Sequence, residues 1–290
     1  MALLPPDAAT LERLSVEPAE LYGCSGPRRS RVLRVGRPRS TTSGRRRPRM
    51  TIMSKIVVCH ARKGGVGKSM LAYELAWMLG APLIDLEWDD GCVSRQWGYR
   101  YEDRGSSPLL TALEKGTVPK LLKGYNKPDL LPGHPDFAVA QPSEGDMADG
   151  ILKWAGEWGR EWVVIDSHPG ASPSAHGALS VAHVVIAPTT LRTYDLNASE
   201  GMVKEMADYP LVLVPNMVPR VPPAAEIDRL RRMVEGTPVQ VAGPIPLVSA
   251  VGTRKKRVAM TSENPPAKAI QPVVNALHSL ADFVRAYADE

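Results

Sequence analysis

The chain has 290 residues and a mass of 31.5 kDa, enough for one large domain or two small ones. Hydrophobic residues make up 43% and charged residues 23%, values close to those of globular proteins, which excludes a wholly disordered or collagen-like chain. No apolar stretch reaches the roughly 18 residues of a membrane span, and the N-terminal residues lack the basic-then-apolar order of a secretory signal. We expect a soluble intracellular protein.

The net charge of +5 is distributed unevenly along the chain. Residues 1–50 contain 11 arginines and 4 acidic residues, a net charge of +7, which leaves −2 for the other 240 residues. The pI of 9.1 therefore says little about the folded part. The three cysteines have no CxxC spacing, so neither a disulfide framework nor a zinc site is expected.

Residues 1–53 are predicted to form a disordered tail rich in arginine and proline. From Ser25 to Arg49 the tail has no acidic residue and almost no large apolar one, so burial cannot offset the entropy of ordering it. Three explanations stay open: a nucleic-acid-binding arm, an organelle transit peptide, or translated sequence upstream of a true start at Met50 or Met53. The last is favoured, because a strand begins directly after Met53 and because proline and acidic residues are unusual in transit peptides.

Residues 54–290 are predicted to form one α/β domain with a doubly wound, mostly parallel sheet and helices on both faces. Short apolar runs alternate with longer amphipathic stretches, which is typical of strands joined by crossover helices. Strands are expected at Lys55–His60, Pro82–Glu87, Phe137–Gln141, Trp162–Asp166, His183–Ala187, Leu211–Pro215 and Val239–Ile245. Helices are expected at about Ser69–Leu79, Asp146–Trp158, Ser174–Val181, Asp195–Asp208, Ala224–Val234 and Ala267–Ala288, with short helices and loops between Arg95 and Pro135.

A glycine-rich loop follows the first predicted strand. Residues 61–69 read A-R-K-G-G-V-G-K-S and lead directly into a helix. This order predicts the loop of a P-loop NTPase, because glycines let backbone N–H groups converge on phosphate oxygens and the helix N-terminus adds partial positive charge. Lys68 is predicted to contact the β- and γ-phosphates, and the Ser69 hydroxyl to bind Mg²⁺.

The run K-G-G-V-G-K-S, residues 63–69, resembles the deviant Walker A loop of the ParA/MinD family. The general P-loop pattern has glycine where this chain has Arg62. The resemblance implies that ATP and Mg²⁺ bind and that ATP promotes a homodimer in which Lys63 reaches the nucleotide of the opposite subunit. An exposed lysine without such a role is the alternative. The implied nucleotide-binding residues are Lys63, Gly64, Gly65, Val66, Gly67, Lys68, Ser69, Met70 and Asn216.

Three later segments fit the same resemblance. Asp85 and Glu87 resemble the second acidic motif, in which the family usually has Asp-x-Asp and the second acid acts on the attacking water and on magnesium. A carboxylate that only caps a strand end is the alternative for Asp85. Asp166 ends a strand similar to Walker B, and Asn216 stands where the family contacts adenine. The implied catalytic residues are Lys63, Lys68, Asp85, Glu87 and Asp166, and the implied Mg²⁺ ligands are Ser69 and Asp166.

His168 departs from the family pattern. It stands two residues after Asp166, in the predicted switch loop, where the family commonly has the first of two prolines. A solvated loop histidine is favoured over a side chain that tunes the switch.

The branches of the family differ in features that a sequence contains. Cys59 and Cys92 belong to no cluster-binding set, which argues against the iron–sulfur reductase and the metal-cluster carriers. Residues 271–290 have one arginine against three acidic residues, so an anionic membrane would attract them weakly. DNA partition remains. The basic cluster Arg254, Lys255, Lys256 and Arg257 is predicted to bind DNA phosphates without reading bases, with a solvated charge run as the alternative.

Together with these patterns, the resemblance implies a DNA-partition ATPase that dimerises on ATP, binds nonspecific DNA and is released by slow, partner-stimulated hydrolysis. The expected partner is a ParB-like centromere-binding protein, and the expected location is the cytoplasm, on the nucleoid and without membrane binding. The alternative is a nucleotide-switched regulatory or cell-positioning protein of the MinD/ParA group with little catalytic role.

Overall fold

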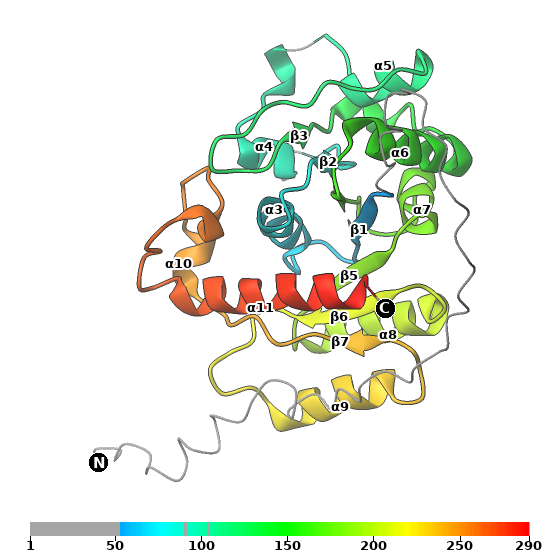
Figure 1. Ribbon diagram of the computed structural model, residues 1–290. Coiled ribbons are helices and arrows are strands. Elements are labelled where there is room, and N and C mark those ends of the chain that lie inside the picture. Colours follow the sequence, from blue (N-terminus) through cyan, green and yellow to red (C-terminus); the bar gives the residue numbers. More distant parts are fainter. Residues whose placement is uncertain (1–52, 90–91, 104, 290) are drawn as a thin grey trace, which may run out of the picture.

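The computed structural model describes residues 53–89, 92–103 and 105–289. The predicted tail lies outside these ranges except for Met53, so the explanations for it remain predictions. Within the described ranges, one sheet of seven parallel strands has the order β3-β2-β4-β1-β5-β6-β7 (Figure 1). The strands are β1 (Lys55–Cys59), β2 (Leu83–Asp85), β3 (Leu130–Leu131), β4 (Trp162–Asp166), β5 (Val184–Thr189), β6 (Leu211–Pro215) and β7 (Gln240–Val241).

Helices lie between these strands and after the last one. The α-helices are α3 (Lys68–Met78), α4 (Val93–Trp97), α5 (Pro108–Glu114), α6 (Glu144–Trp158), α7 (Pro173–Ser180), α8 (Thr193–Met206), α9 (Ala224–Val234), α10 (Ser249–Gly252) and α11 (Gln271–Tyr287). Short 3₁₀ helices lie at Tyr101–Asp103, Pro135–Ala138 and Met260–Ser262. In the described part of the chain, no helix combines the length and the hydropathy that crossing a bilayer requires.

The strands are continuous apolar runs because helices cover both faces of the sheet. Val57 lies in a core cluster with residues of α3 and α11, whereas its neighbours Ile56 and Val58 lie in a second cluster with residues of α5 to α9. Successive side chains of a strand point to opposite faces, so one run feeds both cores. Figure 1 shows α3 on one side of β1 and α7 on the other. The predicted doubly wound α/β class is confirmed.

The third predicted strand is wrong. The segment predicted as the strand Phe137–Gln141 contains the end of a 3₁₀ helix, and the edge strand is instead the pair Leu130–Leu131. Phe137 is buried in the core although its backbone is not a strand, because an irregular segment can deliver one large apolar side chain. Two apolar residues before a proline are too few to produce a periodic signal.

Parallel pairing brings the functional loops to one edge of the sheet. Asp166 at the end of β4 pairs in register with Cys59 of β1 on one side and with Asp85 of β2 on the other. β6 ends at this edge too, directly before Asn216. Every acidic residue singled out in the sequence therefore converges on the glycine loop that joins β1 to α3.

Candidate functional site

The glycine loop between β1 and α3 has the backbone of a ligand cradle. Gly65 and Gly67 have φ values of 81° and 96°, in the left-handed region that favours glycine. A Cβ added at Gly67 would also collide with Nδ2 of Asn216, which donates a hydrogen bond of 2.8 Å to the carbonyl oxygen of Val66. Gly67 is the N-cap of α3 and provides no side-chain cap, so the first N–H groups of the helix remain available to an anion.

Lys68, the first residue of α3, lies among carboxylates. Its Nζ is 2.5 Å from Oε1 of Glu87 and 2.8 Å from Oδ1 of Asp166, and its side chain is only 6% exposed. Burial by itself lowers the pKa of Lys68, but the two carboxylates outweigh burial and raise that pKa above its ordinary value. Lys68 is therefore a charged, buried ammonium at the mouth of the loop.

Asp85 is engaged by protein donors rather than by Lys68. Its Oδ1 accepts from the Glu87 N–H at 3.0 Å, and its Oδ2 accepts from the N–H and the hydroxyl of Ser94 at 2.8 and 2.5 Å. Burial, helped by the Asp166 carboxylate, raises the pKa of Asp85 to about 7. Of the two acids predicted in this motif, Glu87 contacts the lysine and Asp85 holds the segment that carries Glu87.

His168 is not the solvated loop histidine that the sequence favoured. Its Nδ1 lies 2.9 Å from Oε2 of Glu87, and its ring stacks on Trp88 with centroids 3.6 Å apart and an interplanar angle of 15°. The side chain is 19% exposed. The prediction of a solvated histidine is wrong because the solvation of a loop residue depends on which neighbours pack against it. Here the neighbour is Trp88, which comes from a different loop.

The residues around Lys68 fit a magnesium ion. Oδ2 of Asp166 is fully buried and has no hydrogen-bond partner among the described residues. Such an oxygen is suited to bind a cation or a water molecule of its hydration shell. Ser69 lines a cavity of about 340 Å³ at the glycine loop, together with Lys63, Lys68, Glu87 and others. Glu87, Asp89 and His168 also have ligand atoms within 4.8 Å of one another, but an imidazole suits transition metals better than Mg²⁺.

Lys63 points toward the helix that follows β5. Its Nζ is 3.8 Å from Oδ1 of Asp195 and 5.2 Å from the centroid of the Tyr194 ring, both at the start of α8. Thr190 donates a hydrogen bond of 2.5 Å to the other oxygen of Asp195. The Lys63 side chain is 46% exposed, so it is accessible from outside the subunit.

A second cavity of about 400 Å³ adjoins the glycine loop and shares Gly67, Met70 and Met217 with the first. Asn216, which stands where the family contacts adenine, lines it together with residues 245–249. Glu74 of α3 also lines this cavity. Its carboxylate accepts hydrogen bonds of 2.7 and 3.1 Å from the N–H groups of Met260 and Thr261. Glu74 was not predicted, because nothing in a buried helical face marks which acid will cap a distant loop.

The basic cluster 254–257 borders this second cavity rather than forming a separate patch. Arg254 and Lys256 line it, and both pair with Glu263 at 2.9 and 2.8 Å. Lys255 and Arg257 are exposed. Glu263 therefore offsets part of the charge that the sequence concentrates here.

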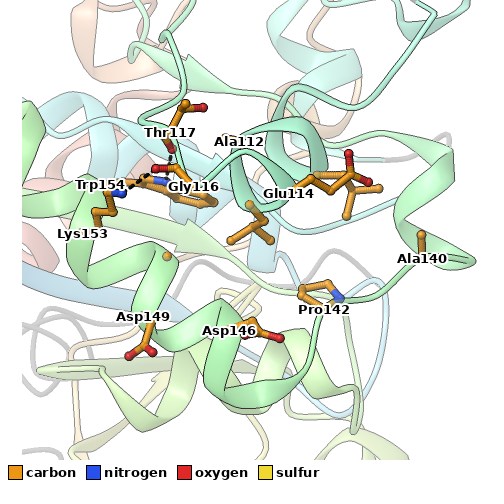
Figure 2. A pocket seen from close by; sticks show the side chains of 13 residues that line it. Ala112, Glu114, Gly116, Thr117, Ala140, Pro142, Asp146, Asp149, Lys153 and Trp154 are labelled. Atoms are coloured by element: carbon orange, nitrogen blue, oxygen red, sulfur yellow. Dashed lines mark hydrogen bonds between the residues drawn. The ribbon is translucent and has the colours of Figure 1, made fainter.

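A third cavity, of about 470 Å³, shares no lining residue with the other two. Figure 2 shows it between α5, which contributes Glu114, and α6, which contributes Asp149 and Lys153. Three acids line it and its one lining lysine, Lys153, is exposed, so the loop cavity with its buried Lys68 is better suited to an anion although it is smaller.

No protein-family model matches the chain, and no curated protein matches it by sequence. Solved structures do match. Apo McdA from Cyanothece aligns with a TM-score of 0.62 and 16% identity over 78% of this chain and 99% of that one. MinD from Pyrococcus horikoshii, complexed with Mg-ADP, has a TM-score of 0.62 and 20% identity over 80% and 96%. A putative plasmid partition protein from Borrelia burgdorferi, bound to AMPPNP, has a TM-score of 0.62 and 17% identity over 80% and 99%.

The chain has the MinD fold. The resemblance read from residues 63–69 is thereby confirmed at the level of architecture. At identities of 16 to 20% the likeness concerns the MinD fold alone, and the chemistry of this chain rests on its own side chains.

Proposed function

We propose that this chain is a nucleotide switch of the ParA/MinD kind that binds ATP with Mg²⁺ and hydrolyses it to ADP and phosphate. The observation that carries the proposal is Lys68, a buried ammonium between two carboxylates, at the end of a loop whose glycines take positive φ. A buried lysine at a helix N-terminus beside such a loop is the arrangement that phosphate recognition needs. The nucleotides bound to the Pyrococcus and Borrelia proteins support a nucleotide as the ligand here.

Lys68 has to exchange partners for the site to work. Its charge is neutralised by Glu87 and Asp166 in this structure. On binding, Lys68 turns to phosphate oxygens, and Glu87 is left to orient the attacking water. Ser69 and Asp166 would hold Mg²⁺, which would neutralise phosphate charge. The cavity beside Asn216 has a volume suited to a nucleoside, which would place the base there.

The Lys68→Ala variant tests the ATPase. Calorimetric titration with ATP and Mg²⁺ should lose about 100-fold or more in affinity, since a charge-assisted contact to a dianionic phosphate disappears from a water-poor site. Phosphate release should fall to background. Lys120→Ala, which removes an exposed lysine, is the matched control and should bind ATP as the wild type does. Unchanged affinity in Lys68→Ala would refute a phosphate role for this loop.

The finer proposal is DNA partition. Lys63 would cross to the nucleotide of a second subunit, so ATP would promote a homodimer, and the cluster 254–257 would bind nonspecific DNA on the nucleoid in the cytoplasm. The exposure of Lys63, Lys255 and Arg257 supports this. A ParB-like centromere-binding protein would stimulate hydrolysis, and no membrane contact is proposed.

A second candidate is a nucleotide-switched regulatory or positioning protein without DNA binding. The pairing of Arg254 and Lys256 with Glu263 favours it, because it lowers the net charge of the basic cluster. DNA binding in the presence of ATP separates the two candidates, and its quantitative form is given in the Discussion.

A further inference from the structure

His168 links the loop after β4 to the segment after β2 through two different contacts. The Nδ1 atom of its imidazole is 2.9 Å from Oε2 of Glu87, and the ring face lies on the indole of Trp88 at 3.6 Å. Glu87 and Trp88 are consecutive in the chain, so the hydrogen bond and the stack come from one short segment. The two contacts together fix both the position and the plane of the imidazole.

The hydrogen bond has a defined direction. An ionised carboxylate only accepts, so Nδ1 of His168 carries the hydrogen and donates it to Glu87. The two oxygens of Glu87 therefore have different partners. Oε1 accepts from the ammonium of Lys68 at 2.5 Å, and Oε2 accepts from His168 at 2.9 Å.

These two partners respond differently when phosphate arrives. Lys68 is drawn to the phosphates, so Oε1 loses its donor and becomes free to accept a hydrogen bond from water. His168 is not needed to contact the phosphates, so its hydrogen bond to Oε2 of Glu87 can persist. A glutamate held by neither partner would lose its fixed orientation, because its side chain has several rotatable bonds.

We propose that His168 is a positioning residue for Glu87, holding Oε2 so that Oε1 faces the attacking water after Lys68 has turned to the nucleotide. The inference rests on the proposed ATPase function. In this role His168 needs no contact with the nucleotide or the water, because it acts only through Glu87. The stack on Trp88 is part of the arrangement, because it opposes rotation of the imidazole away from Glu87.

The test compares His168→Asn with His168→Leu in the full chain. The Asn amide nitrogen occupies the topological place of Nδ1 and can still donate to Glu87, whereas Leu fills similar space without a donor. His168→Leu should lower kcat about 10-fold or more, as misplacement of a water-orienting group does. The affinity for a nonhydrolysable ATP analogue should change less than about 3-fold. His168→Asn should recover a large part of kcat. His278→Asn, on an exposed position of α11, is the matched histidine control.

A double-mutant cycle with Glu87→Gln supplies a readout that general destabilisation would not move. If His168 acts through Glu87, then His168→Leu should have almost no further effect on kcat once Glu87 is replaced. Additive losses in the cycle would overturn the inference. Equal kcat for His168→Leu and wild type would overturn it too. Thermal unfolding of each variant checks that the site is folded.

Three outcomes separate this inference from others. If the wild type binds no ATP, the proposed function fails and takes the inference with it, whereas normal wild-type turnover with an unaffected His168→Leu sinks the inference alone. If a zinc-selective chelator that spares Mg²⁺ reproduces the His168→Leu defect in the wild type, then His168 serves as a metal ligand with Glu87 and Asp89, and the positioning role is wrong.

Discussion

Among single residues, the site carries more negative charge than its one buried lysine neutralises. Asp85 and Asp166 are strand neighbours, both fully buried, and Glu87 lies close by. Lys68 bonds to Glu87 and Asp166 but not to Asp85. Burial and the Asp166 carboxylate raise the pKa of Asp85 to about 7. Asp85 can therefore hold a proton near neutral pH, which reduces the excess of negative charge.

That shift predicts how stability depends on pH. The pKa of Asp85 rises from 3.8 to about 7 on folding, so between these values the folded protein holds a proton that the unfolded chain releases. The stability that this proton contributes is fully present below the pKa of the unfolded state. It is lost as the pH rises through the pKa of the folded state. Relative to wild type, Asp85→Asn should therefore gain free energy of unfolding between about pH 5 and about pH 8, on the order of a few kcal/mol.

Urea denaturation of both proteins at the two pH values measures the gain. Asp208→Asn, an exposed acid after α8, is the control and should track the wild type. A constant difference between Asp85→Asn and wild type across this range would show that Asp85 has the same pKa in both states.

At the scale of elements, the glycine loop, the loop after β4 and the segment after β2 depend on one another. The N–H of Gly170 donates to the carbonyl oxygen of Ala61 at 3.1 Å, which joins the loop after β4 to the start of the glycine loop. Asn216 after β6 braces the same loop at Val66. Groups that follow β4 and β6 thus hold the short loop that follows β1, in which Gly65 and Gly67 take positive φ.

Gly67 and Gly64 form a matched pair for testing this loop. Gly67→Ala would place a Cβ against Asn216 in a backbone with φ of 96°, whereas a Cβ at Gly64 meets no atom within 4 Å. Gly67→Ala should lower the free energy of unfolding by about 2 kcal/mol or more, and Gly64→Ala by less than about 0.5 kcal/mol. Chemical denaturation without nucleotide measures both. Equal losses would mean that the bracing by Asn216 does not constrain Gly67.

At the scale of the whole molecule, the basic cluster 254–257 lies beside the cavity that contains Asn216. The basic cluster, the proposed base cavity and the carboxyl edge of the sheet are neighbours, because Arg254 and Lys256 line the cavity that also contains Asn216. A nucleotide in this cavity would contact the wall that carries the cluster. DNA binding through Lys255 and Arg257 would then be sensitive to the nucleotide state.

The DNA proposal predicts a specific salt dependence. Each neutralised phosphate contributes about −0.9 to the slope of log affinity against log salt, so Lys255→Ala with Arg257→Ala should flatten the slope by about 2 per bound subunit. ATP affinity should not change. Lys115→Ala with Lys120→Ala removes two exposed charges elsewhere and is the control.

The measurement needs both the full chain and a chain that begins at Met53, because the 11 arginines of residues 1–50 would themselves bind DNA. If the double variant keeps the wild-type slope in the shorter chain, the cluster is a solvated surface and the regulatory alternative is favoured.

The sequence by itself determined the parts whose signals are local. The order of strand, glycine loop and helix at residues 55–79 predicted β1, the loop and α3, and the predicted strands Pro82–Glu87 and Trp162–Asp166 contain Asp85 and Asp166, which the structure pairs in register. These structural predictions are confirmed because parallel strands with both faces buried must be apolar, and because glycines at positive φ mark a tight loop between a strand and a helix.

Only the tertiary structure decided which polar groups meet. Lys68 pairs with carboxylates 19 and 98 residues away, His168 stacks on a tryptophan 80 residues earlier in the chain, and Glu74 caps a loop 186 residues later. No period in the sequence encodes such contacts, because they depend on strand order and on the packing of irregular loops. The same reason explains the two-residue strand Leu130–Leu131, which depends on its pairing with β2 and on the bridge between Leu130 and Leu122.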